Sequence, residues 1–175
     1  MTEEIRVSWS EYHQKIELLA AIVYRSGWHF DQILCLARGG LRAGDIFSRI
    51  YEKPLAILSA SSYGGDGGRS RHQLTIAQSI SMTTASLGAN ILLVDDLADS
   101  GITLQETVAW LENSDRYVVN EVKTAVVWYK AQSIFKPDFY VDYLPDSPWV
   151  RQPFEVYDRM TLAELDQQVP KVRSR

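Results

Sequence analysis

Residues 91–103 read ILLVDDLADSGIT. The first four positions are apolar throughout, which predicts a short strand buried on both faces. Residues 95–99 then place three acids within five positions, and residues 100–103 add two hydroxyls and a glycine before a helical pattern over 104–111. Unpaired backbone N–H groups at a helix N-terminus favour anions. The stretch therefore predicts a strand, a polar loop and a helix whose N-terminus binds a phosphate dianion.

The rest of the chain continues this alternation of strands and helices. Short apolar runs bounded by glycine or proline predict buried strands at residues 33–37, 55–58 and 124–129. Apolar residues recur at helical spacing after Ser10, which we expect to be an N-cap, and again over residues 43–50. Strands that are apolar throughout and alternate with helices are typical of parallel sheets covered on both faces. The predicted fold class is α/β, a parallel sheet flanked by helices.

Two further segments have a clear local signature. Residues 64–71 hold four glycines in eight positions, a composition that cannot pack a core, so we expect a mobile loop there. Thr161 is followed three residues later by Glu164, which predicts a capping box at the start of a short last helix.

Length and composition limit the classes of function. A chain of 175 residues with 46% hydrophobic and 23% charged residues is expected to form one domain. Its net charge of -4 weighs against a nucleic-acid-binding protein. Cys35 is the single cysteine, so neither a disulfide framework nor a cysteine metal cluster is expected. No apolar run approaches the roughly 20 residues of a membrane span, and residues 1–6 carry acids where a signal peptide needs positive charge. We therefore expect a cytoplasmic protein.

Two adjacent carboxylates follow directly on the strand of residues 91–94. In an open α/β sheet, ligands bind beyond the carboxyl ends of the strands. Asp95 and Asp96 would stand there, where carboxylates accept hydrogen bonds from sugar hydroxyls or hold Mg²⁺. The structural alternative makes them turn acids, with Ser100 as the N-cap of the next helix. Three acids directly before a phosphate-binding helix N-terminus favour the first interpretation.

Residues 94–103, VDDLADSGIT, resemble the motif that binds phosphoribosyl pyrophosphate (PRPP) in the type I phosphoribosyltransferases. In that family two acids follow a hydrophobic strand, and a loop of the form Asp-Thr-Gly-x-Thr receives the 5-phosphate; Ser100 here keeps the hydroxyl of the usual threonine. The resemblance implies Asp95 for the ribose hydroxyls, Asp96 as the Mg²⁺ ligand, and Asp99 as the general base toward the purine. The 5-phosphate contacts that it implies are Ser100, Gly101, Ile102 and Thr103.

Other segments resemble the purine branch of this family. Residues 36–40, LARGG, are similar to its pyrophosphate loop, which implies Arg38 and Gly39 as PRPP contacts. Residues 61–71 are similar to its flexible loop over PRPP, with Arg69 as the contact and Arg71 as the alternative. Lys130 falls where the branch places a lysine that reads the purine 6-oxygen. Residues 140–154 are similar to the C-terminal hood of the bacterial xanthine-guanine phosphoribosyltransferases, where Trp149 would stack on the base and Val150 contact its 2-position.

The resemblance implies an enzyme that transfers the phosphoribosyl group of PRPP to xanthine, guanine or hypoxanthine with Mg²⁺. We expect one phosphoribosyltransferase domain over residues 1–175, with residues 130–160 as its base-binding hood, assembled as a homodimer or homotetramer. Two alternatives stay open, namely a phosphoribosyltransferase for another base and a PRPP-sensing regulator that binds nucleic acid. A dinucleotide-binding dehydrogenase is disfavoured because no G-x-G-x-x-G opens the first helix. Structural alternatives also remain for Lys130 (exposed to solvent), Asp99 (a helix cap) and Trp149 (core).

Overall fold

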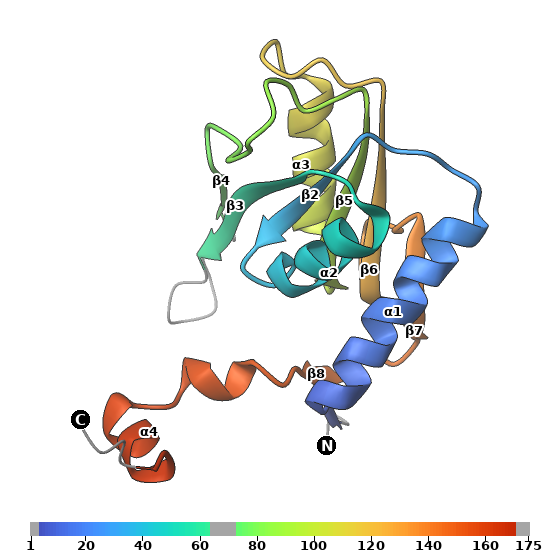
Figure 1. Cartoon of the computed structure of the whole chain (residues 1–175). Coiled ribbons are helices and arrows are strands. Elements are labelled where there is room, and N and C mark those ends of the chain that lie inside the picture. The colour runs from blue at the N-terminus through green and yellow to red at the C-terminus, as the bar shows by residue number, and fades with distance from the viewer. Residues whose placement is uncertain (1–3, 64–72, 171–175) are drawn as a thin grey trace. The chain divides into compact units, whose positions relative to one another are not determined.

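The computed structural model describes residues 4–63 and 73–170, shown in Figure 1. The chain divides into two compact units: residues 15–147 form the larger, and residues 1–14 together with 148–175 form the smaller. The prediction of one domain with a hood over residues 130–160 stays a prediction. Lys130 through Ser147 lie in the larger unit, and the segment from Pro148 onward lies in the smaller.

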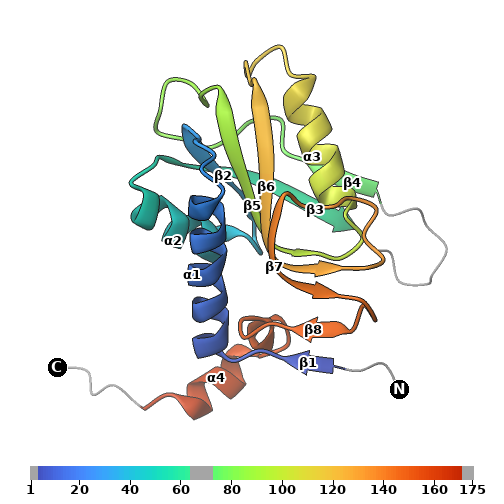
Figure 2. The same ribbon diagram turned by 90° about the vertical axis from the view of Figure 1, so that its right-hand side faces the viewer.

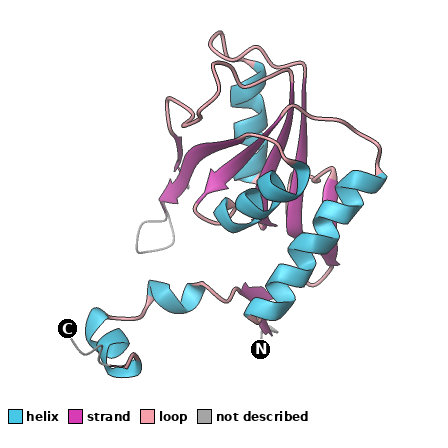
Figure 3. Cartoon of the chain, viewed as in Figure 1, coloured by secondary structure: helices cyan, strands magenta, loops and turns pink. Residues whose placement is uncertain are grey.

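The larger unit is built on a six-stranded sheet (Figure 3). Its strand order is β4-β3-β2-β5-β6-β7, and every pair is parallel except β3 with β4. The strands are β2 (Gln32–Ala37), β3 (Leu55–Tyr63), β4 (Gln73–Ile76), β5 (Asn90–Ala98), β6 (Glu121–Lys130) and β7 (Phe139–Leu144). The prediction of a parallel sheet is confirmed, with one antiparallel strand at its edge.

β2 and β5 are the centre of this sheet, and both are buried along their apolar runs. The side chains of Ile33, Leu34 and Cys35 are fully buried, as are those of Leu92 and Leu93. Within the sheet, β2 has β3 as its neighbour on one side and β5 on the other. The chain therefore leaves β2 in one direction and later returns to pair with its other edge. Such a reversal is a topological switch point, and it opens a crevice at the carboxyl ends of the two strands. The topology therefore predicts a binding site near the carboxyl ends of β2 and β5, where residues 37–40 and 95–101 lie.

Helices cover both faces of the sheet. α2 (Leu41–Tyr51) packs so closely that a Cβ atom on Gly44 would lie 2.6 Å from Cβ of Cys35. α3 (Ile102–Glu112) buries Leu104 and Leu111 in a core with the opposite set of strand residues, which includes Leu34, Leu36, Leu58, Leu93 and Val126. Figure 2 shows α2 and α3 on opposite sides of the sheet. α1 (Trp9–Arg25) is joined to α2 by the hydroxyl of Tyr51, which donates to the carbonyl of Ala20 at 2.6 Å.

The start of α1 corrects one prediction. The cap is Ser8 rather than Ser10: the Ser8 hydroxyl accepts from the amide of Glu11 at 3.2 Å, and the Glu11 carboxylate accepts from the Ser8 amide at 2.8 Å. This reciprocal capping box needs an acid three residues after the cap. Ser8 has that acid, whereas the residue three after Ser10 is His13.

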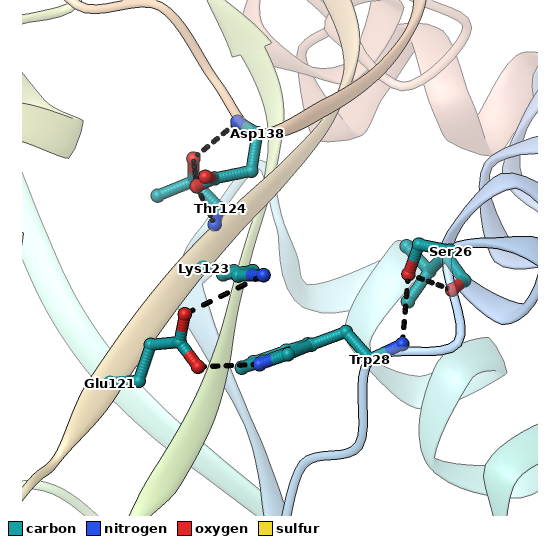
Figure 4. Close-up of polar contacts among 7 residues, drawn as sticks. Ser26, Trp28, Glu121, Lys123, Thr124 and Asp138 are labelled. Carbon is teal, nitrogen blue, oxygen red and sulfur yellow. Dashed lines mark hydrogen bonds and ion pairs between the residues drawn. The ribbon is translucent and has the colours of Figure 1, made fainter.

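Two polar clusters lie near the amino-terminal ends of the strands of this sheet (Figure 4). Trp28 donates its indole N–H to Glu121 at 2.6 Å, and the ammonium of Lys123 lies 5.0 Å from the Trp28 ring. Asp138 accepts from both the amide and the hydroxyl of Thr124, at 2.8 and 2.9 Å. These contacts tie the start of β6 to the segments before β2 and β7, at the end of the strands opposite the crevice.

The smaller unit contains one short sheet and two short helical turns. β1 (Glu4–Arg6) pairs in parallel with β8 (Trp149–Arg151). The helical turns are η1 (Glu155–Asp158) and α4 (Leu162–Gln168). α4 begins at the predicted capping box of Thr161 and Glu164, which is confirmed. Over the described residues of both units, no helix combines the length and the apolar character needed to cross a bilayer.

Candidate active site

The turn after β2 touches the end of β5. A Cβ atom on Gly39 would lie 2.3 Å from Oδ1 of Asp96, and one on Gly40 would lie 2.5 Å from the carbonyl oxygen of Val94. Both distances are far below van der Waals contact: a side chain at position 39 would have to displace the Asp96 carboxylate, and one at position 40 would meet backbone. The peptide bond between Ala37 and Arg38 is cis. The Arg38–Gly40 turn and the acids of β5 therefore form one continuous wall of the crevice.

Asp95 and Asp96 lie inside β5 and not in the loop that follows it. β5 continues to Ala98 because Asp95 and Leu97 pair with Val126 and Trp128 of β6. Burial, and then the negative charge of Asp96, raise the pKa of the Asp95 carboxyl well above its ordinary value. Ribose hydroxyl donors or a cation at this pair would relieve the unfavourable charge.

The loop between β5 and α3 is short and has the geometry of an anion site. Gly101 is the N-cap of α3 with φ of 80°, a left-handed conformation that glycine adopts without strain. The first intrahelical bond runs from the amide of Gln105 to the carbonyl of Gly101. The amides of residues 102–104 therefore precede the hydrogen-bond ladder of α3. The Ser100 hydroxyl lies 3.4 Å from the Ile102 amide.

Asp99 meets two side chains from the end of β6. The ammonium of Lys130 lies 3.0 Å from Oδ1 of Asp99, and the side-chain amide of Gln132 donates to the same oxygen. The Lys130 side chain is only 4% exposed, whereas that of Asp99 is 44% exposed. The structure thus contradicts both alternatives for these residues: Lys130 does not extend into solvent, and the N-cap of α3 is Gly101 rather than Asp99. It brings a buried cation and an accessible carboxylate together beside the loop of residues 99–101.

The carboxylate of Asp99 and the side chain of Gln132 line a cleft of about 340 Å³ in the larger unit, and the buried Lys130 lies behind Asp99 outside this lining. Its lining includes Asp95, the loop of residues 99–103, Leu74 and Gln132. Gln132 is the functional candidate that sequence reasoning missed. It lies two residues after Lys130 in a segment without a motif, and only the pairing of β5 with β6 brings it to Asp99.

The adjacent acids Asp95 and Asp96 of β5 fit a metal that is shared with a ligand. Among the described residues, no group of three histidine, cysteine or acidic side chains could hold a metal ion. Asp95 and Asp96 supply oxygen donors, which suit Mg²⁺, and Mg²⁺ commonly takes one or two carboxylates and completes its shell with phosphate oxygens and water. The pair therefore fits a Mg²⁺ ion that arrives with a phosphorylated substrate.

The remaining predicted site residues are placed as follows. Arg38 is exposed in the turn that touches Asp96. Thr103 and Ile102 are half-buried in the first turn of α3. Trp149, 55% exposed, and the buried Val150 belong to β8 in the smaller unit. Arg69, Arg71 and the glycine-rich segment 64–71 lie outside the described residues.

The switch point between β2 and β5, the paired acids and the loop before α3 agree with the family that the sequence resembles. The sequence model of the phosphoribosyl transferase domain matches residues 8–159. The chain belongs to the phosphoribosyltransferase family. Among its relatives, a xanthine-guanine phosphoribosyltransferase of Gluconobacter oxydans is 27% identical over 150 residues, which cover 85% of this chain and 83% of the relative.

Solved structures share the phosphoribosyltransferase fold. A xanthine-guanine-hypoxanthine phosphoribosyltransferase of Helicobacter pylori superposes with a TM-score of 0.73 at 20% identity, over 94% of this chain and 99% of the other. A purine phosphoribosyltransferase of Pyrococcus horikoshii gives a TM-score of 0.69 at 24% identity, over 86% and 93% of the two chains. The α/β fold predicted from the sequence, a parallel sheet flanked by helices, is confirmed.

Proposed function

We propose that this phosphoribosyltransferase transfers the 5-phosphoribosyl group of PRPP to a 6-oxopurine (xanthine, guanine or hypoxanthine) and releases pyrophosphate. The observation that carries the proposal is the buried ammonium of Lys130, 3.0 Å from the carboxylate of Asp99 at the edge of the phosphate cleft. A 6-oxopurine needs a donor for its oxygen and an acceptor for the proton of its imidazole ring. Lys130 and Asp99 supply these two groups side by side.

The chemistry follows from the placement of the residues. The bond between C1 of the ribose and the pyrophosphate oxygen breaks, and its electron pair leaves with pyrophosphate. A ring nitrogen of the purine forms the new bond to C1, and its proton passes to Asp99. The N-terminus of α3, with the hydroxyls of Ser100 and Thr103, holds the 5-phosphate. Asp95 accepts from the ribose hydroxyls, and Arg38 with the Gly39 turn binds the pyrophosphate.

Mg²⁺ is proposed as the cofactor, with Asp96 as its protein ligand. When bound, the ion neutralises the charge that develops on the leaving pyrophosphate. The paired acids at the end of β5 support this assignment, because they offer oxygen donors beside the turn of residues 38–40.

Lys130 supports the choice of a 6-oxo base. An ammonium donates hydrogen bonds and accepts none. Adenine presents a 6-amino donor, so its complex would set two donors against each other at a nearly buried position. Trp149 and Val150 are proposed as the stacking and 2-position contacts, which the resemblance to the xanthine-guanine enzymes supports. The family resemblance also supports a cytoplasmic homodimer or homotetramer.

The direct test is a panel of six bases (xanthine, guanine, hypoxanthine, adenine, uracil and orotate) with PRPP and Mg²⁺, read as nucleotide formation. We expect turnover with the 6-oxopurines and little with the other three. Preferred turnover of adenine, uracil or orotate would place the enzyme in another acceptor class. No turnover with any base, together with specific binding of DNA or RNA, would favour the regulator.

A further inference from the structure

The carboxylate of Asp99 is held from the β6 side by two donors of different kinds. Lys130 contributes a charged ammonium and Gln132 a neutral amide, and both reach Oδ1. In the proposed reaction Lys130 must also serve the 6-oxygen of the base. When the Lys130 ammonium binds the base, its interaction with Oδ1 of Asp99 weakens, and the side-chain amide of Gln132 still donates to that oxygen. A neutral donor orients the carboxylate while reducing its basicity less than a second cation would.

The backbone around Gln132 is fixed at several points. The backbone N–H of Gln132 donates to the Ser147 hydroxyl at 3.2 Å. The backbone N–H groups of its neighbours Ala131 and Ser133 donate to the carbonyls of Leu144 and Lys130, respectively, both at 3.0 Å. Gln132 is itself exposed and lines the cleft. Its side chain therefore projects from an anchored segment toward Asp99.

The same segment also contacts the phosphate loop. The amide of Ile134 donates to the carbonyl of Ser100 at 2.9 Å. A Cβ atom on Gly101 would lie 2.3 Å from the hydroxyl oxygen of Ser133. Residues 130–134 thus join the base-reading lysine to the phosphate loop, and Gln132 stands between these two contacts, opposite Asp99.

We propose that Gln132 is a positioning residue for the general base: it holds Oδ1 of Asp99 while Lys130 binds the purine oxygen, so that Oδ2 receives the proton from the ring nitrogen. This inference rests on the proposed function, in which Asp99 is the proton acceptor. It assigns no contact between Gln132 and either substrate. The loss of Gln132 should accordingly lower kcat and leave the KM for PRPP unchanged.

The test compares Gln132→Ala and Gln132→Glu with Gln78→Ala, a control at an exposed glutamine after β4. Turnover is measured with PRPP, Mg²⁺ and the base that reacts fastest, and thermal melting checks folding. We expect Gln132→Ala to lower kcat about 10-fold, the usual scale for a lost hydrogen bond to a charged group. Gln132→Glu places a second carboxylate next to that of Asp99. The acid limb of the pH profile of kcat/KM should therefore move to higher pH. Within residues 4–63 and 73–170, Lys130 is the charged group that contacts this carboxylate.

The decisive measurement repeats Gln132→Ala in an Asp99→Asn background. If Gln132 acts through Asp99, the second substitution costs about 2-fold or less there, because interacting residues are not additive. A full 10-fold cost in both backgrounds, or a Gln132→Ala enzyme equal to Gln78→Ala, would overturn the positioning role. Wild-type turnover by Asp99→Asn would instead refute the proton step of the proposed function.

Discussion

The backbone of Gly39 lies against the carboxylate of Asp96, so that a Cβ atom on the glycine would stand 2.3 Å from Oδ1 of the aspartate. Gly39 follows β2 and Asp96 belongs to β5, its neighbour in the sheet. The contact joins the turn proposed to bind pyrophosphate to the carboxylate proposed to hold Mg²⁺. A side chain at position 39 would displace that carboxylate.

We predict that Gly39→Ala raises the KM for PRPP about 10-fold or more, because the new methyl group displaces the Asp96 carboxylate and each 1.4 kcal/mol of lost interaction is tenfold. The obstacle is the end of a side chain, which can rotate away, so the melting temperature should change little. Steady-state kinetics with PRPP varied at saturating base measure the effect. An unchanged KM for PRPP would mean that Asp96 is not part of the PRPP site.

Gly40→Ala is the matched substitution with the opposite expected result. Here the added Cβ meets backbone, at 2.5 Å from the carbonyl oxygen of Val94, and the backbone cannot rotate away. Overpacking of this kind lowers the free energy of unfolding by about 2 kcal/mol. Urea unfolding of the two variants side by side separates the effects. Equal stability losses at positions 39 and 40 would contradict the distinction.

Asp99→Asn should lower kcat by about 10²–10⁴-fold, the usual contribution of a general base. The amide preserves the shape of the loop, so PRPP binding, measured by calorimetry, should stay within a few-fold of wild type. Asp115→Asn, an exposed aspartate beyond α3, is the control. Turnover within a few-fold of wild type would exclude Asp99 as the base.

Lys130→Ala should lower kcat/KM for guanine, xanthine and hypoxanthine by about 30-fold or more and narrow their advantage over adenine. The variant removes the donor that the proposed function assigns to the 6-oxygen. Competition between guanine and adenine for limiting PRPP measures the change, with the exposed Lys53→Ala as a control. Unaltered discrimination would leave the 6-oxopurine preference without its main chemical support.

Cys35 should be inert in the folded protein. Burial raises the pKa of its thiol from 9.0 to about 11, so the thiol stays protonated at pH 8. Iodoacetamide at pH 8 should label it only after unfolding in urea. Because the folded state holds this proton more tightly, the stability contribution is complete below pH 9 and is lost between pH 9 and about 11. Rapid labelling without urea would contradict the buried position.

The strands that could be predicted are those whose own residues are apolar throughout. β2 and the first half of β5 have this signature, whereas the second half of β5 carries acids and is a strand only because β6 extends alongside it. β1 and β8 are three residues each and pair across the length of the chain, so neither has a local signal. Ile50 fits the apolar pattern of α2 and is nevertheless 55% exposed, whereas Ala43, Gly44 and Phe47 are the buried residues of this helix.

The site shows the same division. The acids of β5 and the phosphate loop are contiguous in the sequence and could be read directly. The contact between Lys130 and Asp99 depends on the register of β5 with β6, in which Ala98 stands opposite Tyr129. No pattern within either segment encodes that register. The contact between Gln132 and Asp99 could therefore not be predicted without the sheet.

The close fit of Ser133 against Gly101 has a consequence for protein engineering. A loop grafted after β6 to accept a different base would have to keep a small residue at position 133, because a Cβ on Gly101 would already stand 2.3 Å from the serine oxygen. In libraries that randomise residues 131–135 alone, many variants should thus be inactive because the loop of residues 99–101 is distorted. Residues 131–135 should therefore be randomised together with residues 99–101, because the two segments contact each other.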